Sequence, residues 1–296
     1  MNRQQFIKSL ALVPLAGAAM KLNELSKFTG PLESTASMPV LFMGHGSPMN
    51  AIEENEFVRG FRTMGEGIPR PRAVLVISAH WETKGTFVTA MKKPETIHDF
   101  GGFPKALFDV HYPAPGSPAF ATETKNLIHK TDVGLDQTWG LDHGTWSVVK
   151  HLYPKADVPV IQMSIDYSKD AQYHYDLAKE LASLRKKGIL IIGSGNLVHN
   201  LGMVAWDKLN TGAYGYDWAL EASDNMKKFI LADDHPSLIN FRSQGQSWNL
   251  AIPSPEHYLP LIYTLALKNE KDKISIHNDK AVGGSLTMTS VKFSEV

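Results

Sequence analysis

The stretch Pro39-Val-Leu-Phe-Met-Gly-His-Gly-Ser-Pro48 is a short apolar run that ends at a histidine between two glycines. An apolar run of this kind is typical of a strand buried on both faces of a sheet. Gly44 and Gly46 allow backbone angles and close approaches that other residues resist. We therefore predict a strand that presents His45 at its C-terminal end, which is where ligands bind in open α/β sheets. For His45 taken alone, a structural histidine in a turn is the alternative.

Two further apolar runs are also followed by a histidine. The run 73–78 leads to His80, and the run 188–193 leads to His199. If these strands are parallel neighbours of the first, their C-terminal ends meet at one edge of the sheet and the three imidazoles share a crevice. Because neutral imidazole is the commonest metal ligand, the set predicts a metal site at this edge.

His257 is a fourth candidate ligand, and Glu256 beside it offers a carboxylate. The pair lies at an expected helix start, with Ser254 as the N-cap and Pro255 as the first helical residue. A histidine or histidine–carboxylate site suits Fe(II), Zn(II) or Mn(II), and three protein ligands would leave positions open for catalysis. A hydrogen-bonded structural role is the alternative for each histidine.

Further polar residues lie in loops without an obvious structural duty. His143 belongs to Leu141-Asp-His-Gly144, and the pair His98-Asp99 opens the segment 97–118, which is rich in glycine, proline and aromatic residues. Loops of this length in compact domains are usually functional or disordered, and the aromatic content argues against disorder. We interpret these residues as groups that face substrate or support the metal ligands, with plain packing as the alternative.

The composition narrows the function classes. The chain has 296 residues, of which 43% are hydrophobic and 20% charged, as in an ordinary soluble globular protein. Lys+Arg and Asp+Glu balance at 30 each, so there is no basic field to attract nucleic acid. The absence of cysteine excludes thiolate metal sites and iron–sulfur clusters, so that any metal must be held by histidines and carboxylates.

Residues 1–37 are predicted to be a signal-like leader followed by a linker. Arg3 and Lys8 precede the apolar stretch 10–20, which is too short to cross a bilayer but has the length of a signal-peptide core. We expect no membrane integration, while export to the periplasm is compatible with this segment. A loosely packed N-terminal helix is the alternative, in which case the protein would be cytoplasmic.

Residues 38–296 are predicted to form one α/β domain, with a central, mostly parallel or mixed sheet flanked by helices and the metal site at the C-terminal rim of the strands. The expected strands are 40–43, 73–78, 85–91, 158–165, 188–193 and 285–293. The expected helices are 52–64, 119–130, 147–152, 170–187 and 216–231, with one more from Ser254.

Seven motifs in this order resemble the DOPA 4,5-dioxygenase group of the class III extradiol ring-cleavage dioxygenases, the superfamily of the protocatechuate 4,5-dioxygenase catalytic subunit. They are Gly44-His-Gly-Ser-Pro-Met49, Ser78-Ala-His-Trp81, Ile97-His-Asp-Phe-Gly-Gly-Phe-Pro104, Tyr112-Pro-Ala-Pro-Gly116, Leu141-Asp-His-Gly144, Gly195-Asn-Leu-Val-His-Asn200 and Pro255-Glu-His-Tyr-Leu-Pro260. The resemblance covers the chain from about Met38 to the C-terminus and is more specific for the family than for the substrate.

The resemblance implies one divalent metal ion, with Fe(II) expected for activity and Zn(II) possible as the bound ion. The implied ligands are His45, His80 and His257, with His199 either as a fourth ligand or as an acid–base group close to the metal. The wider superfamily usually has two histidines and one glutamate, so Glu256 stays open as the third ligand in place of His257. His143 would lie beside substrate or dioxygen.

The implied reaction is extradiol cleavage of a catechol by O2 to a muconic semialdehyde, so the expected partners are a small aromatic diol and O2. The expected substrate-binding residues are His98, Asp99, Trp81 and Phe103. Phe100 and Trp146 are further candidates for the wall of the pocket, with core packing as the alternative for all these aromatic residues. The alternative functions are a zinc-dependent hydrolase using the same site and a non-catalytic binding protein of this fold.

Overall fold

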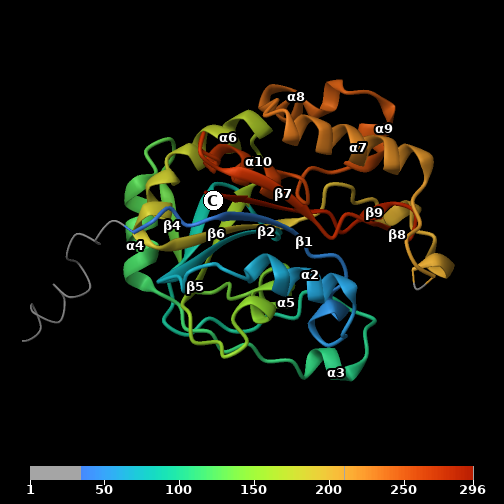
Figure 1. The fold of residues 1–296 in the computed structure, drawn as a ribbon. Coiled ribbons are helices and arrows are strands. Elements are labelled where there is room, and N and C mark those ends of the chain that lie inside the picture. Colours follow the sequence, from blue (N-terminus) through green and yellow to red (C-terminus); the bar gives the residue numbers. More distant parts are fainter. Residues whose placement is uncertain (1–34, 210, 296) are drawn as a thin grey trace, which may run out of the picture. The chain divides into compact units, whose positions relative to one another are not determined.

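An eight-stranded mixed β-sheet in the order β4-β3-β5-β2-β6-β1-β10-β7 forms the centre of the fold (Figure 1). The computed structural model describes residues 35–209 and 211–295. The strands of this sheet are β1 (Val40–Gly44), β2 (Ala73–Thr83), β3 (Thr86–Thr89), β4 (Val133–Asp136), β5 (Val160–Asp166), β6 (Ile189–Gly195), β7 (Lys273–His277) and β10 (Ser290–Ser294). A separate two-stranded sheet pairs β8 (Ala281–Val282) with β9 (Leu286–Thr287).

Strands β5, β2, β6 and β1 are parallel neighbours in the middle of the sheet. Ile192 of β6 pairs with Leu41 of β1 on one side and with Val76 of β2 on the other. Strand β3 is antiparallel to β5, and β10 is antiparallel to both β1 and β7. The predicted α/β class with a mixed sheet is confirmed. Because the strands that lead to the three histidines are adjacent and parallel, their C-terminal ends meet at one edge.

Both faces of the central strands are buried, as the apolar runs predict. Val40 and Phe42 of β1 belong to the hydrophobic core on one face, and Leu41 and Met43 belong to the core on the other. Successive side chains of a strand point to opposite faces. A strand covered on both faces therefore needs apolar residues at every position, which explains the lack of alternation.

Helices cover the sheet on its two faces, with α6 and α10 on one and α2 and α5 on the other (Figure 1). The α-helices are α2 (Glu56–Gly65), α3 (Lys105–Phe108), α4 (Pro118–Leu127), α5 (His143–Leu152), α6 (Ala171–Lys179), α7 (Asp217–Leu231), α8 (His235–Ile239), α9 (Gln246–Ala251) and α10 (Leu259–Leu267). The 3-10 helices are η1 (Pro48–Ala51), η2 (Ala182–Lys187), η3 (Leu201–Met203), η4 (Trp206–Lys208) and η5 (Phe241–Ser243).

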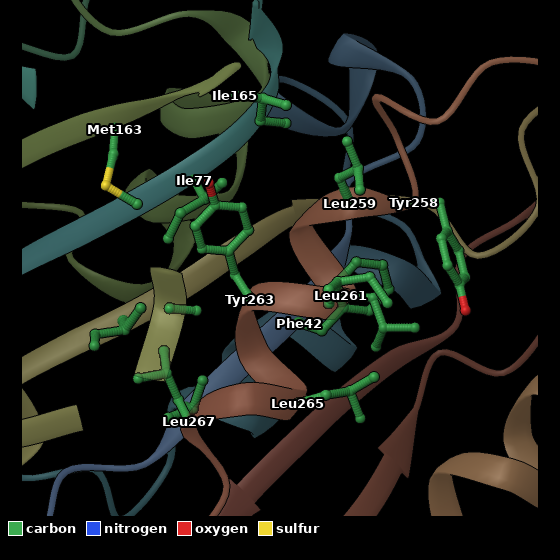
Figure 2. Close-up of a cluster of buried hydrophobic side chains, with 14 of the residues drawn as sticks. Phe42, Ile77, Met163, Ile165, Tyr258, Leu259, Leu261, Tyr263, Leu265 and Leu267 are labelled. Carbon is green, nitrogen blue, oxygen red and sulfur yellow. The ribbon is translucent and has the colours of Figure 1, made fainter. Parts of the chain in front are cut away.

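Helix α10 is apolar on nearly all sides because it lies between the sheet and an outer layer of helices. Figure 2 shows Leu261 and Tyr263 of α10 together with Phe42 of β1 and Ile77 of β2. A helix that is hydrophobic all round is a buried helix. Its position matters for the site, because the turn that precedes α10 carries His257.

The start of α10 corrects one prediction. Ser254 does not cap a helix; its hydroxyl donates to the carboxylate of Glu256 at 2.9 Å. Residues 255–258 form a turn, and α10 begins at Leu259 with Pro260 in its first turn. Proline is well suited to that position because it has no N–H to leave unpaired. The Ser254 hydroxyl therefore bonds to the carboxylate of Glu256, and not to a backbone N–H as the predicted N-cap would.

Other helix and strand boundaries differ from the predicted ones, because tertiary contacts override the local sequence pattern. Helix α5 begins at His143, four residues before the predicted helix, since the side chain of Asp142 caps it by accepting from the N–H of Thr145. The predicted helix 170–187 is divided into α6 and η2. Strand β4 was not expected; it is a short edge strand whose residues do not form an apolar run.

The segment 97–118 contains the short helix α3 and otherwise lacks regular structure until α4 begins at Pro118, as expected for a long loop. None of the helices in residues 35–209 and 211–295 is long and apolar enough to cross a bilayer. The leader predicted at the N-terminus falls almost entirely outside these residues.

Candidate metal centre

His45 follows β1 directly, and its side chain is almost completely buried. Its Nδ1 lies 3.0 Å from the hydroxyl of Ser194, and that hydroxyl donates its proton to the carbonyl of Gly144. A serine hydroxyl has a single proton, so Ser194 accepts the proton of His45 Nδ1. The neighbouring strand thus holds His45 as the Nδ1–H tautomer, which leaves the lone pair of Nε2 free.

The two glycines that flank His45 are required by the chain segment that covers this turn. A Cβ atom at Gly44 would lie 2.6 Å from the carbonyl oxygen of Met288. A Cβ atom at Gly46, where φ is +60°, would lie 2.3 Å from the sulfur of Met288. Glycine at both positions lets the C-terminal segment close over the turn and bury His45.

His80 lies within β2, which corrects the prediction that this strand ends before it. The pairing of β2 with β5 shifts register between Ile77 and Glu82, so His80 sits on an irregular stretch of the strand. Such irregularities re-aim side chains at functional sites. His80 Nε2 lies 3.1 Å from Nε2 of His45, and His80 Nδ1 lies 3.4 Å from a carboxylate oxygen of Asp99.

His257 lies in the turn before α10, and its carbonyl accepts a hydrogen bond from the N–H of Asn196 just after β6. Its Nδ1 lies 3.1 Å from Oε1 of Glu256. The imidazoles of His45, His80 and His257 each offer one nitrogen, and these three atoms lie within 4.8 Å of one another. Strands β1 and β2 and the turn before α10 thus bring the three predicted metal ligands together.

His199 lies four residues beyond β6, where its N–H donates to the carbonyl of Ala251 at 2.9 Å. Its ring stacks on the ring of His257, with 3.5 Å between the centroids and 10° between the planes. His199, His257 and Glu256 form a second group of donor atoms within 4.8 Å. The structure therefore places His199 beside the first three imidazoles.

His143 is the first residue of α5, and its ring lies 3.8 Å from that of His80 between centroids. Asp99 holds His143 twice, accepting from its backbone N–H at 2.9 Å and pairing with its Nδ1 at 2.9 Å. His80, Asp99 and His143 form a third group of candidate ligand atoms within 4.8 Å. The five imidazoles predicted to bind the metal or to act beside it, those of His45, His80, His143, His199 and His257, thus form one cluster.

Burial favours the neutral form of four of these imidazoles, those of His45, His80, His199 and His257. Burial, assisted by repulsion from neighbouring imidazoles, lowers the pKa of His45 and His257 well below the ordinary value. Burial and His143 lower the pKa of His80 to about 3. Burial also lowers the pKa of His199 to about 4, although Glu256 opposes this shift. Neutral imidazole is the form that binds metal ions.

The donor set fits a divalent cation. The Nε2 atoms of His45 and His80 face each other at 3.1 Å, although a second proton, which would have to lie on Nε2, is disfavoured on both rings. Two buried acceptors in this arrangement repel each other unless a cation lies between or beside them. The nitrogens on the far side of His45 and His257 are held by Ser194 and Glu256, as is usual for histidines that bind metal.

A buried polar network beneath the cluster was not predicted. Asp142 is completely buried, and its carboxylate accepts hydrogen bonds from Ser78 Oγ at 2.7 Å and Gln162 Nε2 at 2.6 Å. Burial, together with the charge of Asp99, raises the pKa of Asp142. The sequence offers one signal, since an aspartate before His143 suits an N-cap. Nothing local identifies Ser78, Gln162 or Ser194 as partners.

The predicted substrate-binding residues lie in different surroundings. Phe103 packs against Phe100, which meets His143 edge to face at 5.5 Å between centroids. His98 pairs through Nε2 with the carbonyl of Val110 at 3.0 Å. Trp81 stacks on Trp139 and is buried. Trp146, also a candidate for the pocket wall, is a core residue with no exposed surface.

Comparison with known proteins identifies the family. Residues 38–233 match the family described as the catalytic LigB subunit of aromatic ring-opening dioxygenase. The chain belongs to this family. It is therefore an aromatic ring-opening dioxygenase, and members of the family use a divalent metal, which agrees with the imidazole cluster.

Relatives of this LigB-family chain are similar over most of their length. A protein of Escherichia coli K12 named 4,5-DOPA dioxygenase extradiol is 46% identical over 264 residues, which cover 88% of this chain and 96% of the relative. A protein of Beta vulgaris with the same name is 35% identical over 261 residues, covering 86% and 95%. A crystal structure of an uncharacterized E. coli K12 protein has a TM-score of 0.74 and 42% identity, covering 86% of this chain and 99% of that one. These relatives assign the LigB-family chain to extradiol ring cleavage.

Proposed function

We propose that this LigB-family enzyme opens the ring of a DOPA-like catechol with O2 and gives a muconic semialdehyde. The reaction takes place at one divalent metal ion held by His45, His80 and His257. The observation that carries this proposal is the convergence of three neutral imidazole nitrogens within 4.8 Å. The names of the E. coli and plant relatives support DOPA as the first substrate to test.

His257, and not Glu256, is proposed as the third ligand. Its ring nitrogen joins those of His45 and His80 in one group, whereas the Glu256 carboxylate bonds to His257 Nδ1 and to the hydroxyl of Ser254. A carboxylate on the far nitrogen orients a ligating imidazole and raises its basicity. Glu256 would thus contribute its charge through His257.

Fe(II) is the proposed metal for activity, while Zn(II) binds the same kinds of ligand more tightly and is the ion expected to compete for the site. Fe(II) bound by His45, His80 and His257 would supply the Lewis-acid and redox chemistry that joins the catechol to O2. The four proposed roles of the protein are to bind the catechol, orient it, keep water out and accept its protons.

His199 is the proposed base. It is neutral at physiological pH because burial lowers its pKa to about 4, so its ring can accept the second catechol proton. Its stacking on His257 places it beside the proposed metal ligands without making it one of the three. His143, held by Asp99 from the other side, is proposed to face substrate or dioxygen.

Phe103 and Phe100 are proposed to form a wall of the substrate pocket, because Phe100 meets the ring of His143. Trp81 stacks on Trp139, and His98 pairs with the carbonyl of Val110. Both residues are proposed to shape that wall. Asp99 is also predicted to bind substrate, but both of its carboxylate oxygens already contact His143.

The experiment that tests this function loads the protein with Fe(II) under anaerobic conditions, adds DOPA and then admits oxygen. We expect uptake of one O2 for each catechol consumed and a yellow ring-opened product. Elemental analysis of protein purified without oxygen identifies the metal, and activity should follow iron content. Failure to consume oxygen with any of a panel of catechols would refute the proposed reaction.

Single substitutions separate the proposed roles. His45→Ala should lose both metal and turnover, whereas His199→Ala should keep the metal and lose turnover. Loss of metal in His199→Ala would instead make His199 a ligand. His129→Ala is the matched control, because this histidine is exposed and should leave both properties unchanged.

A further inference from the structure

The carboxylate of Asp99 lies between two histidines of the cluster. Its Oδ1 accepts the backbone N–H of His143 at 2.9 Å. Its Oδ2 lies 2.9 Å from Nδ1 of His143 and 3.4 Å from Nδ1 of His80. The side chain is only 17% exposed, so little of the carboxylate faces solvent.

Both imidazoles can meet this carboxylate only through a protonated nitrogen. An ionised carboxylate has acceptors but no donors. The backbone N–H of His143, which can only donate, faces Oδ1, and an imidazole nitrogen faces Oδ2, so Asp99 acts as an acceptor through both oxygens. The ring proton must therefore lie on Nδ1 to meet Oδ2, and a ring with that single proton carries its lone pair on Nε2.

We propose that Asp99 is a positioning residue that sets the Nδ1–H tautomer of His80 and His143 together. The metal ligand and the imidazole at the substrate then both present Nε2 to the centre. The proposal rests on the proposed function for the role of His80 as a ligand. It differs from the expectation that Asp99 contacts substrate, because both of its oxygens are engaged by His143.

An asparagine at this position cannot reproduce these contacts, because it has one acceptor oxygen and one donor NH2. If the amide oxygen stays on the N–H of His143, the NH2 faces two imidazole N–H groups, and His80 and His143 must move their protons to Nε2. A protonated Nε2 cannot bind a metal. If the amide is flipped, its NH2 faces the backbone N–H of His143. That N–H, in the first turn of α5, then loses its acceptor.

The test measures tautomers and metal affinity without turnover. The metal-free protein is labelled with 15N, and long-range 1H–15N spectra report which nitrogen of His80 and His143 carries the proton. Zn(II) affinity is measured by competition with a chromophoric chelator at constant pH. We expect Nδ1–H on both rings in the wild type, and loss of this tautomer with about 10- to 100-fold weaker Zn(II) binding in Asp99→Asn.

Two variants control for the change of charge and for folding. Asp109→Asn removes an equal charge from the same loop, where Asp109 pairs with Lys105 at the surface, and should leave tautomers and affinity unchanged. Asp99→Glu keeps both acceptor oxygens and should retain the Nδ1–H tautomers even if its greater length weakens Zn(II) binding. If Asp99→Asn does not fold, the tautomers of His80 and His143 in Asp99→Glu decide whether the carboxylate sets them.

The outcomes distinguish this proposal from the proposed function. Wild-type tautomers and Zn(II) affinity in folded Asp99→Asn would overturn the positioning role, and a higher KM as the sole defect would assign Asp99 to substrate binding. Protonated Nε2 on His80 in the wild type would also overturn it. If the wild type shows the expected tautomers but binds no Zn(II), the metal site fails while the positioning role of Asp99 stands.

Discussion

Replacing Ser194 by alanine should lower the affinity of the site for a metal ion, because Ser194 supports the proposed ligand His45. In the native protein the Ser194 hydroxyl accepts from Nδ1 of His45 at 3.0 Å and donates to the carbonyl of Gly144. Alanine removes both contacts at a position that is completely buried. The His45 N–H and the Gly144 carbonyl are then left without these partners where water does not reach.

The expected loss of stability follows from the buried groups that lose their hydrogen-bond partners. A buried donor or acceptor that loses its partner costs roughly 1–3 kcal/mol in the free energy of unfolding. For a domain of this size each kcal/mol corresponds to about 2–4 °C in Tm. Since the His45 tautomer is no longer held, we also expect metal affinity to fall about 10- to 100-fold.

The assay combines thermal unfolding of the metal-free protein with Zn(II) competition. The control is Ser243→Ala, which removes an exposed hydroxyl bonded to a carbonyl only three residues away. An unchanged Zn(II) affinity in Ser194→Ala would refute the claim that Ser194 holds the ligating form of His45. A fall in Tm alone would mean that the contact is merely structural.

Three further predictions concern stability and the fit of the turn. Asp272→Asn should lower the free energy of unfolding in urea by about 3–5 kcal/mol, because it leaves the buried guanidinium of Arg185 without its two-point partner; a loss below 1 kcal/mol would contradict this. Burial lowers the pKa of His174 from 6.5 to about 4, so the unfolded chain binds more protons between these values. Its stabilising contribution is thus complete above pH 6.5 and lost as pH falls toward 4, and His174→Gln should reduce the difference in unfolding free energy between pH 7 and pH 4 by up to about 3 kcal/mol; equal differences in the two proteins would refute this. Gly44→Ala should destabilise the protein by about 1–3 kcal/mol in the same urea assay and weaken Zn(II) binding, because its Cβ would lie 2.6 Å from the Met288 carbonyl oxygen. Wild-type stability and affinity would show that the segment around Met288 moves aside without cost.

Much of the fold follows from patterns that are local in the chain. The runs that became β1, β2 and β6 are apolar at successive positions, and a strand covered on both faces requires this. The starts of α10 and α5 differ from the predictions, because the hydrogen bonds that Ser254 and Asp142 make in the fold are not visible in the local sequence. In the fold Ser254 bonds to Glu256 and Asp142 caps α5.

The sequence by itself determined the chemical inventory and its approximate placement: twelve histidines, no cysteine, and three histidines that follow apolar runs. These are statements about composition and short-range periodicity, which a chain displays before it folds. They were enough to predict an α/β domain, a sulfur-free metal site and a crevice at the end of the strands, and the seven motifs predicted the family.

Only the tertiary structure decided which nitrogen each imidazole presents. The partner of His45 Nδ1 is a serine 149 residues away, and the partner of His143 is an aspartate 44 residues away. No local pattern predicts such pairs, since they depend on which strands become neighbours and on where the loop 97–118 lies against α5. The physical reason is that a hydrogen bond selects a tautomer only at a separation of about 3 Å, and folding alone sets that separation.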